Sequence, residues 1–467
     1  MKDHIFRMYD IRGRVGTDFN IDCVYALVRS IVAYLLKINP NLTSVAVARD
    51  GRVHGGAIQD EVVRALKDSG IDVIDIGLCH TPIIYFAVFN KLADAGLMIT
   101  ASHNPACDNG LKICLGEKSI WGEQMQEIKE LYKQGSSANT GRRGSYREQN
   151  ISDLYLLWIE NHFNHLKGIK SSFVIDCGNG ATGAIIPKLV ERMGWSNAIL
   201  LYEDVDGTYP NHEADPTVLS NMEDLKNKIK LTDASFGVAF DGDGDRMGAM
   251  TSSGFLVPGD WLLSIFSQPL LKKQPGAAIV FDVKASDIIM NFVKGWSGIP
   301  VISPTGVSWI KKYMTDHKAL LGGELSCHFF FNDRYFGYDD GIYSFMRLFE
   351  IIVESGKSLD QLCSIFPKTY GTIEIRIPCA EHEKSNIVMA VKESFSKRSD
   401  AQLILVDGVR AHFPYGWGVI RVSNTQPAIS LRIESQDLLG LEKIKNDFYQ
   451  VLQYHIDSII VRQHLKM

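Results

Sequence analysis

A serine hydroxyl beside a histidine is the first group in this chain whose type and position suit covalent chemistry. Ser102 lies in the sequence TASHNP at residues 100–105, directly after an apolar run. A serine hydroxyl is a weak nucleophile until a base or a metal ion activates it, and His103 is a candidate base. Serine before Asn-Pro is also common in ordinary turns, so this segment alone leaves a purely structural role open.

Three aspartates at alternate positions, with glycines between them, follow the apolar run 236–240. They are Asp241, Asp243 and Asp245. Carboxylates this close repel one another unless a cation lies among them. An EF-hand would need glycine and glutamate where this chain has Arg246 and Ser252. Mg²⁺ fits better, because it takes few carboxylates and completes its shell with phosphate or water oxygens. A solvated acidic turn is the alternative.

A third loop has a carboxylate and a hydroxyl two residues apart, Glu324 and Ser326, with His328 following. Side chains two apart on an extended chain point to the same side, so this pair can hold two neighbouring sugar hydroxyls. An ordinary loop with a helix cap would have the same composition.

A fourth loop concentrates groups that bind a phosphate dianion. It contains Arg421, Ser423, Asn424 and Thr425. A guanidinium, hydroxyls, an amide and backbone N–H groups within five residues suit such an anion, and a plain β-turn is the alternative. The chain has no GxxxxGK[ST] phosphate loop. Lys112 and Arg246, near the first two loops, add cations that can face a phosphate.

Alternating strands and helices are expected to position the first three loops. Continuous apolar runs predict buried strands at 44–48, 71–76, 96–99, 173–176, 198–202, 236–240, 278–282, 300–303 and 319–321. Helical spacing predicts helices at 56–69, 182–193 and near 286–293. Continuous rather than alternating apolar strands are typical of parallel sheets covered on both faces. The pattern therefore predicts three similar α/β units.

The last hundred residues follow another pattern. Strands are expected at 372–378, 403–406, 417–422 and 428–434, and helices at 381–396 and 438–454. This order predicts an antiparallel sheet with two helices on one face.

The expected fold class is α/β. Three similar α/β domains with mixed, mostly parallel sheets precede a C-terminal α+β domain with an antiparallel sheet, all around a central cleft. The expected bounds are 1–145 with the serine loop, 146–249 with the aspartate loop, 250–362 with the sugar loop and 363–467 with the phosphate loop. Ligands of open α/β sheets bind beyond the carboxyl ends of strands, where Ser102, Asp241 and Glu324 lie.

Composition narrows the class further. At 467 residues the chain is too long for one hydrophobic core, and its net charge of -5 argues against a nucleic-acid partner. The eight cysteines are scattered with no CxxC, which favours reduced thiols and the cytoplasm. No stretch approaches the ~20 apolar residues of a membrane span, and the N-terminus lacks a signal-peptide core. We expect a monomer or weak oligomer without membrane partners.

With these loops, the chain resembles the α-D-phosphohexomutase superfamily, and within it the bacterial phosphomannomutase/phosphoglucomutase group. Four further segments carry the resemblance: FRMYDIRG at 6–13, VDGTYPNH at 205–212, RYFGYDDG at 334–341 and DGVR at 407–410. The likeness covers essentially the whole chain. It departs from the family at Cys327, where relatives have glycine or alanine, and at Val307, which replaces a histidine found in some relatives.

The resemblance implies a role for each loop. Ser102 would be the phosphorylated serine, and its phosphate with the three aspartates would hold Mg²⁺. Glu324 and Ser326 would select the sugar by two hydroxyls, and the fourth loop would hold the phosphate that does not react. The reacting phosphate would be surrounded by Arg12, Lys112, Arg246 and His103, with support from Tyr9 and Asn104 and a substrate contact from Lys284. The general base stays open among His103, Arg12, Lys112 and His328.

The implied activity is that of an isomerase that interconverts hexose 6-phosphate and hexose 1-phosphate, of mannose, glucose or both. Phosphoserine would give its phosphoryl group to the sugar, and the hexose 1,6-bisphosphate would turn over before returning the other phosphoryl group. Phosphoglucosamine mutase is the nearest alternative. A metal-dependent sugar phosphatase and a non-catalytic sugar-phosphate sensor are further ones.

Overall fold

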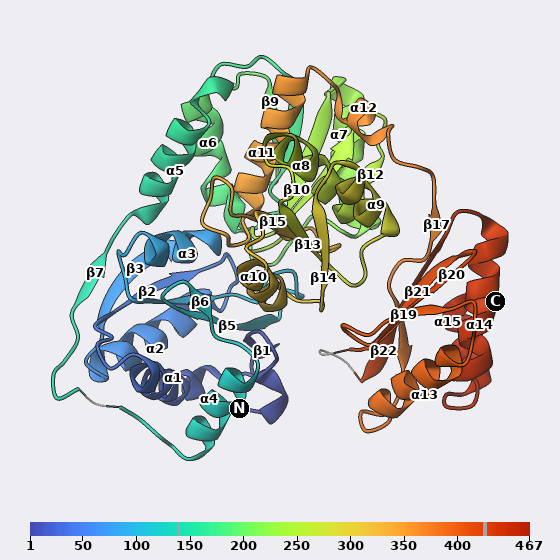
Figure 1. The fold of residues 1–467 in the computed structure, drawn as a ribbon. Helices are drawn as coiled ribbons and strands as arrows, with labels where there is room; N and C mark the ends of the chain where they lie inside the picture. Colours follow the sequence, from blue (N-terminus) through green and yellow to red (C-terminus); the bar gives the residue numbers. More distant parts are fainter. Residues whose placement is uncertain (139, 424–426) are drawn as a thin grey trace. The chain divides into compact units, whose positions relative to one another are not determined.

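The computed structural model describes residues 1–138, 140–423 and 427–467 (Figure 1). The chain forms two compact units: unit 1 contains Met1–Lys273 and Ser326–Cys363, and unit 2 contains Gln274–Leu325 and Ser364–Met467. Each unit has a large hydrophobic core of its own. No helix in the described ranges combines the length and apolarity that a membrane span requires.

The first sheet of unit 1 has seven strands in the order β1-β5-β4-β2-β3-β7, with β6 paired to β5. The strands are β1 (Ile11–Arg14), β2 (Ser44–Arg49), β3 (Asp72–Leu78), β4 (Ala95–Ile99), β5 (Asp108–Leu115), β6 (Lys118–Ser119) and β7 (Tyr146–Glu148). Strands β4, β2, β3 and β7 run parallel, and β5 is antiparallel to β4 and β1. The sheet is therefore mixed, with the serine loop between β4 and β5.

Helices cover both faces of this sheet, as its continuous apolar strands require. They are α1 (Val24–Ile38), α2 (Gly55–Asp68), α3 (Pro82–Phe89) and α4 (Glu123–Lys133). Helices α1, α2 and α4 share one core with Val45 and Val47 of β2. Helix α3 packs on the other face (Figure 1). The side chain of Ile84 occupies the space where Gly96 of β4 has no Cβ atom.

The second sheet of unit 1 has the order β12-β11-β10-β8-β9. Its strands are β8 (Phe173–Asp176), β9 (Ala198–Leu201), β10 (Phe236–Phe240), β11 (Met247–Thr251) and β12 (Leu256–Val257). The remaining elements of unit 1 are α5 (Ile151–His162), α6 (Ile186–Met193), α7 (Glu223–Thr232), α8 (Gly259–Lys273), β16 (Phe329–Phe331), α11 (Gly341–Ser355) and α12 (Leu359–Cys363). Strands β10 and β11 form an antiparallel pair, and the turn between them is the aspartate loop.

Unit 2 begins with three parallel strands, β13 (Ala278–Asp282), β14 (Ile299–Ser303) and β15 (Leu321–Gly323). Helices α9 (Asp287–Gly295) and α10 (Val307–Asp316) connect them. An antiparallel sheet follows, in the order β17-β22-β21-β20-β19 with β18 on β22. Its strands are β17 (Tyr370–Gly371), β18 (Ile375–Pro378), β19 (Gln402–Ile404), β20 (Val409–Phe413), β21 (Gly416–Val422) and β22 (Ala428–Ser435).

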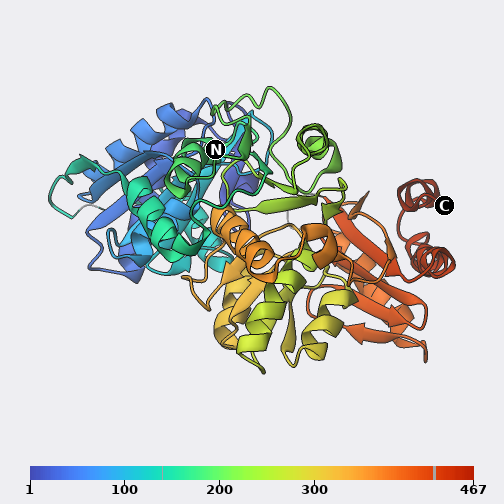
Figure 2. The ribbon, with the colours of Figure 1, turned by 90° about the horizontal axis from the view of Figure 1, so that it is seen from above.

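Three helices pack against one face of the antiparallel sheet and share its core. They are α13 (Lys384–Ser396), α14 (Leu438–Leu452) and α15 (Ser458–Leu465). Figure 2 shows α14 and α15, near the C-terminus, side by side next to the sheet. The sequence predicted two helices here and missed α15, which is only 8 residues long.

The predicted fold class is confirmed: three mixed or parallel sheets with helices precede an antiparallel sheet with helices on one face. Some elements differ. The helix expected at 182–193 is a 3₁₀ turn (Ala181–Ala184) followed by α6, whose first turn holds Pro187. The strand expected at 372–378 is interrupted between β17 and β18, and β20 was missed because Arg410 and His412 break its apolar pattern. The domain bounds at 145, 249 and 362 remain predictions.

Candidate active site

Ser102 lies in the turn after β4, with its backbone in the left-handed region at φ 53°. Its side chain is buried, and its Oγ donates a hydrogen bond to Oδ2 of Asp241 at 2.8 Å. The same Oγ lies 3.2 Å from Nδ1 of His103. Two segments far apart in sequence thus bring a nucleophile, a carboxylate and an imidazole into contact.

The aspartate loop packs directly on the serine loop. A Cβ atom at Gly242 would lie 2.5 Å from the carbonyl oxygen of Ser102, so this close approach requires glycine. Gly244 lies at φ 69°, a conformation that glycine adopts without strain. The glycines between the aspartates therefore allow the loop to turn tightly and to reach Ser102.

The three aspartates are buried, and one ligand oxygen from each lies within 4.8 Å of the others. Burial, and then the charges of Asp245 and Asp243, raise the pKa of Asp241 well above its ordinary value. The ionised form of Asp241 is therefore disfavoured both by burial and by the two neighbouring carboxylates.

Lys112, on β5, supplies part of the balancing charge. Its Nζ lies 2.7 Å from Oδ2 of Asp243 and 2.5 Å from Oδ2 of Asp245. Burial opposes the charge of Lys112, but the two aspartates raise its pKa well above the ordinary value. Burial likewise opposes ionisation of Asp243, yet Lys112 and the hydroxyl of Thr81 bring its pKa below the ordinary value. Lys112 and Asp243 are thus a mutually stabilised ion pair.

The residues of this cluster fit a divalent cation. Oδ1 of Asp243 is buried and has no hydrogen-bond partner among the described residues, although a carboxylate oxygen inside a protein normally has one. Phosphorylation of Ser102 would replace its hydrogen bond to Asp241 by a contact between two anions. A hard cation held by Asp241, Asp243, Asp245 and that phosphate would give Oδ1 of Asp243 a partner and would separate the two anions. This set of oxygen ligands suits Mg²⁺.

Arg246 and His328 form a second charged contact beside the aspartates. Nε of Arg246 donates a hydrogen bond to Nε2 of His328 at 2.9 Å. Nδ1 of the same ring lies 2.9 Å from Oδ2 of Asp339 and 3.5 Å from Oδ1 of Asp245. His328 is therefore held between a guanidinium and two carboxylates.

Arg12 approaches the serine loop from β1. Its guanidinium pairs with Asp10 at 2.5 Å and donates to Oδ1 of Asn104 at 2.9 Å. Burial, then the charges of Arg246 and Arg12, lower the pKa of His103 well below its ordinary value. His103 is thus neutral near pH 7 and can accept a proton. Tyr9 lies nearby on the N-terminal segment, with its ring stacked on Trp121 at a centroid distance of 6.4 Å.

In unit 2, the predicted sugar loop lies at the end of β15. Glu324 is buried and accepts a hydrogen bond from the backbone N–H of Gly306 at 2.6 Å. Nζ of Lys284, just beyond β13, lies 3.6 Å from Oε1 of Glu374. Burial raises the pKa of Glu374, but Lys284 and then Ser430 more than offset this and bring it to about 2. Ser326, the other predicted sugar residue, belongs to unit 1.

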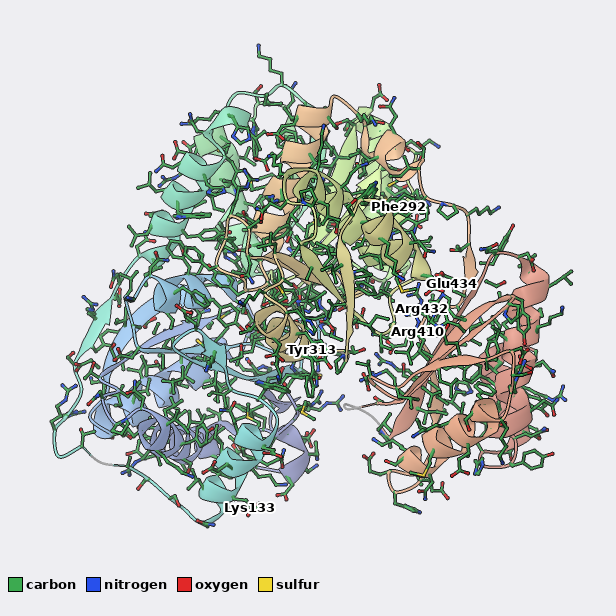
Figure 3. The ribbon with its side chains drawn as sticks, viewed as in Figure 1. Lys133, Phe292, Tyr313, Arg410, Arg432 and Glu434 are labelled. Carbon is green, nitrogen blue, oxygen red and sulfur yellow. The ribbon has the colours of Figure 1, made fainter. Side chains whose placement is uncertain are left out.

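The predicted phosphate loop follows β21. Nε of Arg421 donates to Oδ2 of Asp407 at 2.8 Å, and the buried Ser423 N–H donates to the carbonyl oxygen of Ala428 at 3.0 Å. Asn424 and Thr425 lie outside the described residues. Elsewhere on the antiparallel sheet, three charged side chains contact Trp417: Arg410, Arg432 and Glu434. Figure 3 labels these three charged side chains.

Several residues that the sequence analysis did not select lie at these loops. They are Asp50, Arg52, Thr81, Tyr209 and Asp339. Asp50 and Arg52 directly follow β2, which ends beside β4. The rule that singled out Ser102, a polar residue directly after a buried strand, also applies to this pair. Thr81 has no comparable local signal, because only tertiary contacts bring it to the aspartates. Tyr209 and Asp339 lie in two of the segments that carry the family resemblance, at 205–212 and 334–341, but no role was predicted for them.

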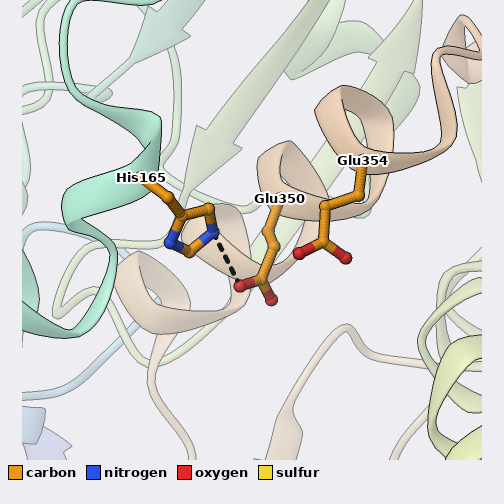
Figure 4. A group of neighbouring side chains, drawn as sticks. All are labelled: His165, Glu350 and Glu354. Atoms are coloured by element: carbon orange, nitrogen blue, oxygen red, sulfur yellow. Dashed lines mark ion pairs between the residues drawn. The ribbon is translucent and has the colours of Figure 1, made fainter.

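A second group of possible metal ligands contains His165, Glu350 and Glu354, two of them on α11 (Figure 4). Nε2 of His165 lies 3.0 Å from Oε1 of Glu350. Glu350 also pairs with Arg334 and lies 3.5 Å from Nε of Arg347. Two guanidinium groups already neutralise this carboxylate, so the group is an ion-pair network and a poor cation site.

Comparisons with known proteins show the family of the chain. Four models of the phosphoglucomutase/phosphomannomutase family match the chain: alpha/beta/alpha domain I at residues 3–139, domain II at 153–254, domain III at 258–370 and the C-terminal domain at 374–451. The chain is 41% identical over 454 residues to a phosphomannomutase/phosphoglucomutase of Pseudomonas syringae pv. tomato, covering 97% of this chain and 96% of the relative.

Two further relatives extend this result. A phosphoglucomutase of Neisseria meningitidis serogroup A is 37% identical, with 96% of each chain covered. The crystal structure of a phosphoglucomutase/phosphomannomutase family protein from Burkholderia thailandensis superposes with a TM-score of 0.89 at 31% identity, covering 97% of this chain and 98% of that one. The chain therefore belongs to the phosphoglucomutase/phosphomannomutase family, within the α-D-phosphohexomutase superfamily.

Proposed function

We propose that this chain is a phosphohexomutase that interconverts hexose 6-phosphate and hexose 1-phosphate, with mannose, glucose or both as the sugar. The observation that carries the proposal is the buried contact between Ser102 and the aspartate cluster, in a chain of this family. A nucleophile, three carboxylates and a lysine converge there, and such an arrangement serves transfer of a phosphoryl group.

In the proposed reaction, the sugar hydroxyl attacks the phosphorus of phosphorylated Ser102. The bond from phosphorus to Oγ breaks, a bond to the sugar oxygen forms, and a hexose 1,6-bisphosphate results. The sugar then exchanges its two ends, and the hydroxyl of Ser102 attacks the other phosphoryl group. The isomeric hexose phosphate leaves, and Ser102 carries phosphate again.

Three cationic residues of unit 1 are proposed to bind the reacting phosphate. Lys112, Arg12 and Arg246 are cations that stabilise charge on the phosphoryl oxygens in transfer. When bound, Mg²⁺ supplies Lewis-acid stabilisation of the negative charge that develops on the serine oxygen. His103 is neutral and close to Oγ of Ser102, which makes it the first candidate for the proton of the attacking hydroxyl.

Residues of unit 2 are proposed to bind the sugar and the phosphate that does not react. Glu324 accepts from a sugar hydroxyl, and Lys284 contacts the substrate. Arg421 and Ser423, with Asn424 and Thr425, bind the distal phosphate. An anchored phosphate makes the attack effectively intramolecular, which contributes up to ~7–11 kcal/mol in well-oriented systems.

Burial favours a mutase over a phosphatase. Ser102 is 3% exposed, and Asp241 and Asp243 are 0% exposed. A phosphatase must admit water to the phosphoserine, whereas a mutase must exclude it to keep the phosphoryl group. A mutase and a phosphatase built on this site would use the same metal and nucleophile, so the access of water to the phosphoserine is what distinguishes them.

The decisive experiment compares mannose 1-phosphate, glucose 1-phosphate and glucosamine 1-phosphate in parallel, with Mg²⁺ and trace glucose 1,6-bisphosphate. We expect hexose 6-phosphate from mannose or glucose 1-phosphate, and inorganic phosphate at a small fraction of turnover. Equal amounts of product sugar and inorganic phosphate would instead indicate a phosphatase. Turnover of glucosamine 1-phosphate alone would indicate phosphoglucosamine mutase, and no turnover of any substrate would favour a sensor.

A further inference from the structure

A buried arginine lies beneath the serine loop. Arg52 follows β2 by three residues, and its side chain is 0% exposed. A charged guanidinium inside a protein is costly unless an acceptor meets each of its donors. The acceptors that bind the Arg52 guanidinium therefore show which parts of the structure depend on it.

All five N–H donors of Arg52 can be accounted for, because its three nitrogens make five hydrogen bonds. Four of them end on backbone carbonyl oxygens of the serine loop: Ser102 at 2.7 Å, Asn104 at 2.6 Å, Pro105 at 2.6 Å and Asp108 at 2.9 Å. The fifth runs from Nε to Oδ2 of Asp50 at 3.1 Å. A single side chain thus fixes the path of the loop from Ser102 to Asp108.

The amide side of Ser102 is held through the same group. The N–H of Ser102 donates to Oγ1 of Thr100 at 2.8 Å, and that hydroxyl donates to Oδ2 of Asp50 at 2.7 Å. Asp50 in turn accepts from Arg52. Arg52, Asp50 and Thr100 therefore close a ring of hydrogen bonds around the backbone of Ser102, one side through its carbonyl and the other through its N–H.

This ring encloses a backbone conformation that serine seldom adopts. Ser102 has φ 53°, in the left-handed region that favours glycine. Its carbonyl oxygen is the atom that Gly242 of the aspartate loop approaches. The ring of Tyr209 lies 5.5 Å from the guanidinium carbon of Arg52, on the side of the aspartate loop. Rotation of the Ser102 peptide would change the direction of Oγ relative to Asp241.

We propose that Arg52, acting with Asp50 and Thr100, is a positioning residue for phosphoryl transfer: it holds the backbone of Ser102 so that Oγ points at the aspartate cluster. The inference rests on the proposed mutase function. Arg52 touches neither substrate nor metal in this role. Lysine cannot replace it, because one ammonium has three donors and cannot span four carbonyl oxygens.

The test compares Arg52→Lys with Arg347→Lys in the full-length protein. Arg347 is also buried in unit 1, and within the described residues its hydrogen bonds and ion pairs are with Asp333, Tyr343 and Glu350, which lie outside the four loops. Both variants lose buried hydrogen bonds and should unfold at lower temperature. Only Arg52→Lys should lower kcat, by about 100-fold, since a small misplacement of a reacting group can cost that much. KM for glucose 1-phosphate should change less than about threefold.

Thr100→Val provides a second, milder variant if Arg52→Lys does not fold. It keeps the side-chain volume and removes only the link between Asp50 and the N–H of Ser102. We expect kcat to fall about tenfold with KM unchanged and with slower phosphorylation of Ser102 by glucose 1,6-bisphosphate.

The outcomes separate this inference from the function on which it rests. An active wild type with unchanged kcat in folded Arg52→Lys, or in Thr100→Val, would overturn the positioning role alone. Equal losses of kcat in Arg52→Lys and Arg347→Lys would also overturn it, because the effect would then be general destabilisation. A wild type inactive on all three sugar phosphates would reject the mutase function itself, and the positioning role with it.

Discussion

The loops of unit 1 and the loops of unit 2 differ in how their charged groups are satisfied. In unit 1 the proposed reacting groups contact one another directly: Ser102 binds Asp241, and Lys112 binds Asp243. In unit 2 the proposed binding groups pair with carboxylates outside the proposed site. Lys284 lies by Glu374, and Arg421 by Asp407.

This difference matches the two proposed roles, phosphoryl transfer in unit 1 and substrate binding in unit 2. Groups that stabilise a transition state are effective when they are fixed before the reaction, because no reorganisation is then needed. Groups that bind and release a sugar phosphate must exchange partners in each turnover. A carboxylate partner keeps Arg421 oriented, and a phosphate dianion can compete for the guanidinium. The comparison predicts large losses of kcat for unit 1 and changes in KM for unit 2.

Ser102→Ala should have the largest effect. We expect kcat in the coupled assay to fall by at least about 10³-fold, because the covalent route disappears. Affinity for glucose 1-phosphate, measured by calorimetry, should change little, since its proposed binding groups lie in unit 2. Thermal unfolding serves as the control for the fold. Full activity of this variant would contradict the phosphoserine mechanism.

Removal of the divalent cation should cause the second-largest loss of kcat. Excess EDTA should stop the wild type, and added Mg²⁺ should restore it. Asp243→Asn removes the charge beside the buried Oδ1 atom without changing shape, so it should lower kcat about 10²–10³-fold, because a metal ion supplies several kcal/mol of charge stabilisation. Turnover that persists in EDTA would exclude the metal role, whatever Asp243→Asn does.

Arg421→Ala should affect binding more than turnover. Loss of a charge-assisted hydrogen bond is worth about 1.5–3 kcal/mol, so KM should rise about 10–100-fold, with a smaller change in kcat. Asp407→Asn is the matched variant: it weakens the partner of Arg421 and should leave KM unchanged or lower it a few-fold. A fall in kcat with constant KM for Arg421→Ala would remove the distinction between the two units.

Sequence reasoning found the parts of the site that local patterns encode. Ser102 and Asp241 follow apolar strands, and their neighbours have unusual compositions, so strand ends and motifs located them. It could not find Thr81, whose contact with Asp243 depends on packing between distant elements. It gave no role to Asp339, although this residue lies in the quoted segment 334–341, because its contact with His328 exists only in the folded chain. It also missed Arg52, although this residue follows a buried strand as Ser102 does, because its five hydrogen bonds exist only in the folded chain.

The fold shows the same division. Strands β8, β10 and β13 coincide with their predicted ranges, since a continuous apolar run specifies a buried parallel strand. Strand β20 was not predicted, because the buried Arg410, its second residue, interrupts the apolar pattern. That arginine binds the carbonyl oxygens of Val283 and Ala285, and only this tertiary contact makes a charged residue acceptable in a strand interior.

The smallest predicted effect concerns stability in acid. The pKa of Glu374 is about 2 in the folded chain, against an ordinary value of 4.5, because Lys284 and Ser430 stabilise its charge despite burial. A depressed folded pKa contributes stability above pH 4.5 that is lost as the pH falls toward 2. Between pH 6 and 3.5 the loss attributable to Glu374 should be about 1 kcal/mol, after allowance for its partial exposure.

Glu374→Gln should therefore show a smaller fall in unfolding midpoint between pH 6 and 3.5 than the wild type. Glu442→Gln is the control, because the exposed carboxylate of Glu442 pairs with Lys445 at 2.7 Å, and ion pairs with an exposed partner contribute little. Its acid dependence should match the wild type. The paired state of Lys284 would not depend on Glu374 if both variants behaved alike. Unit 2 would then lack one of the two ion pairs, Lys284 with Glu374, on which the contrast with unit 1 rests.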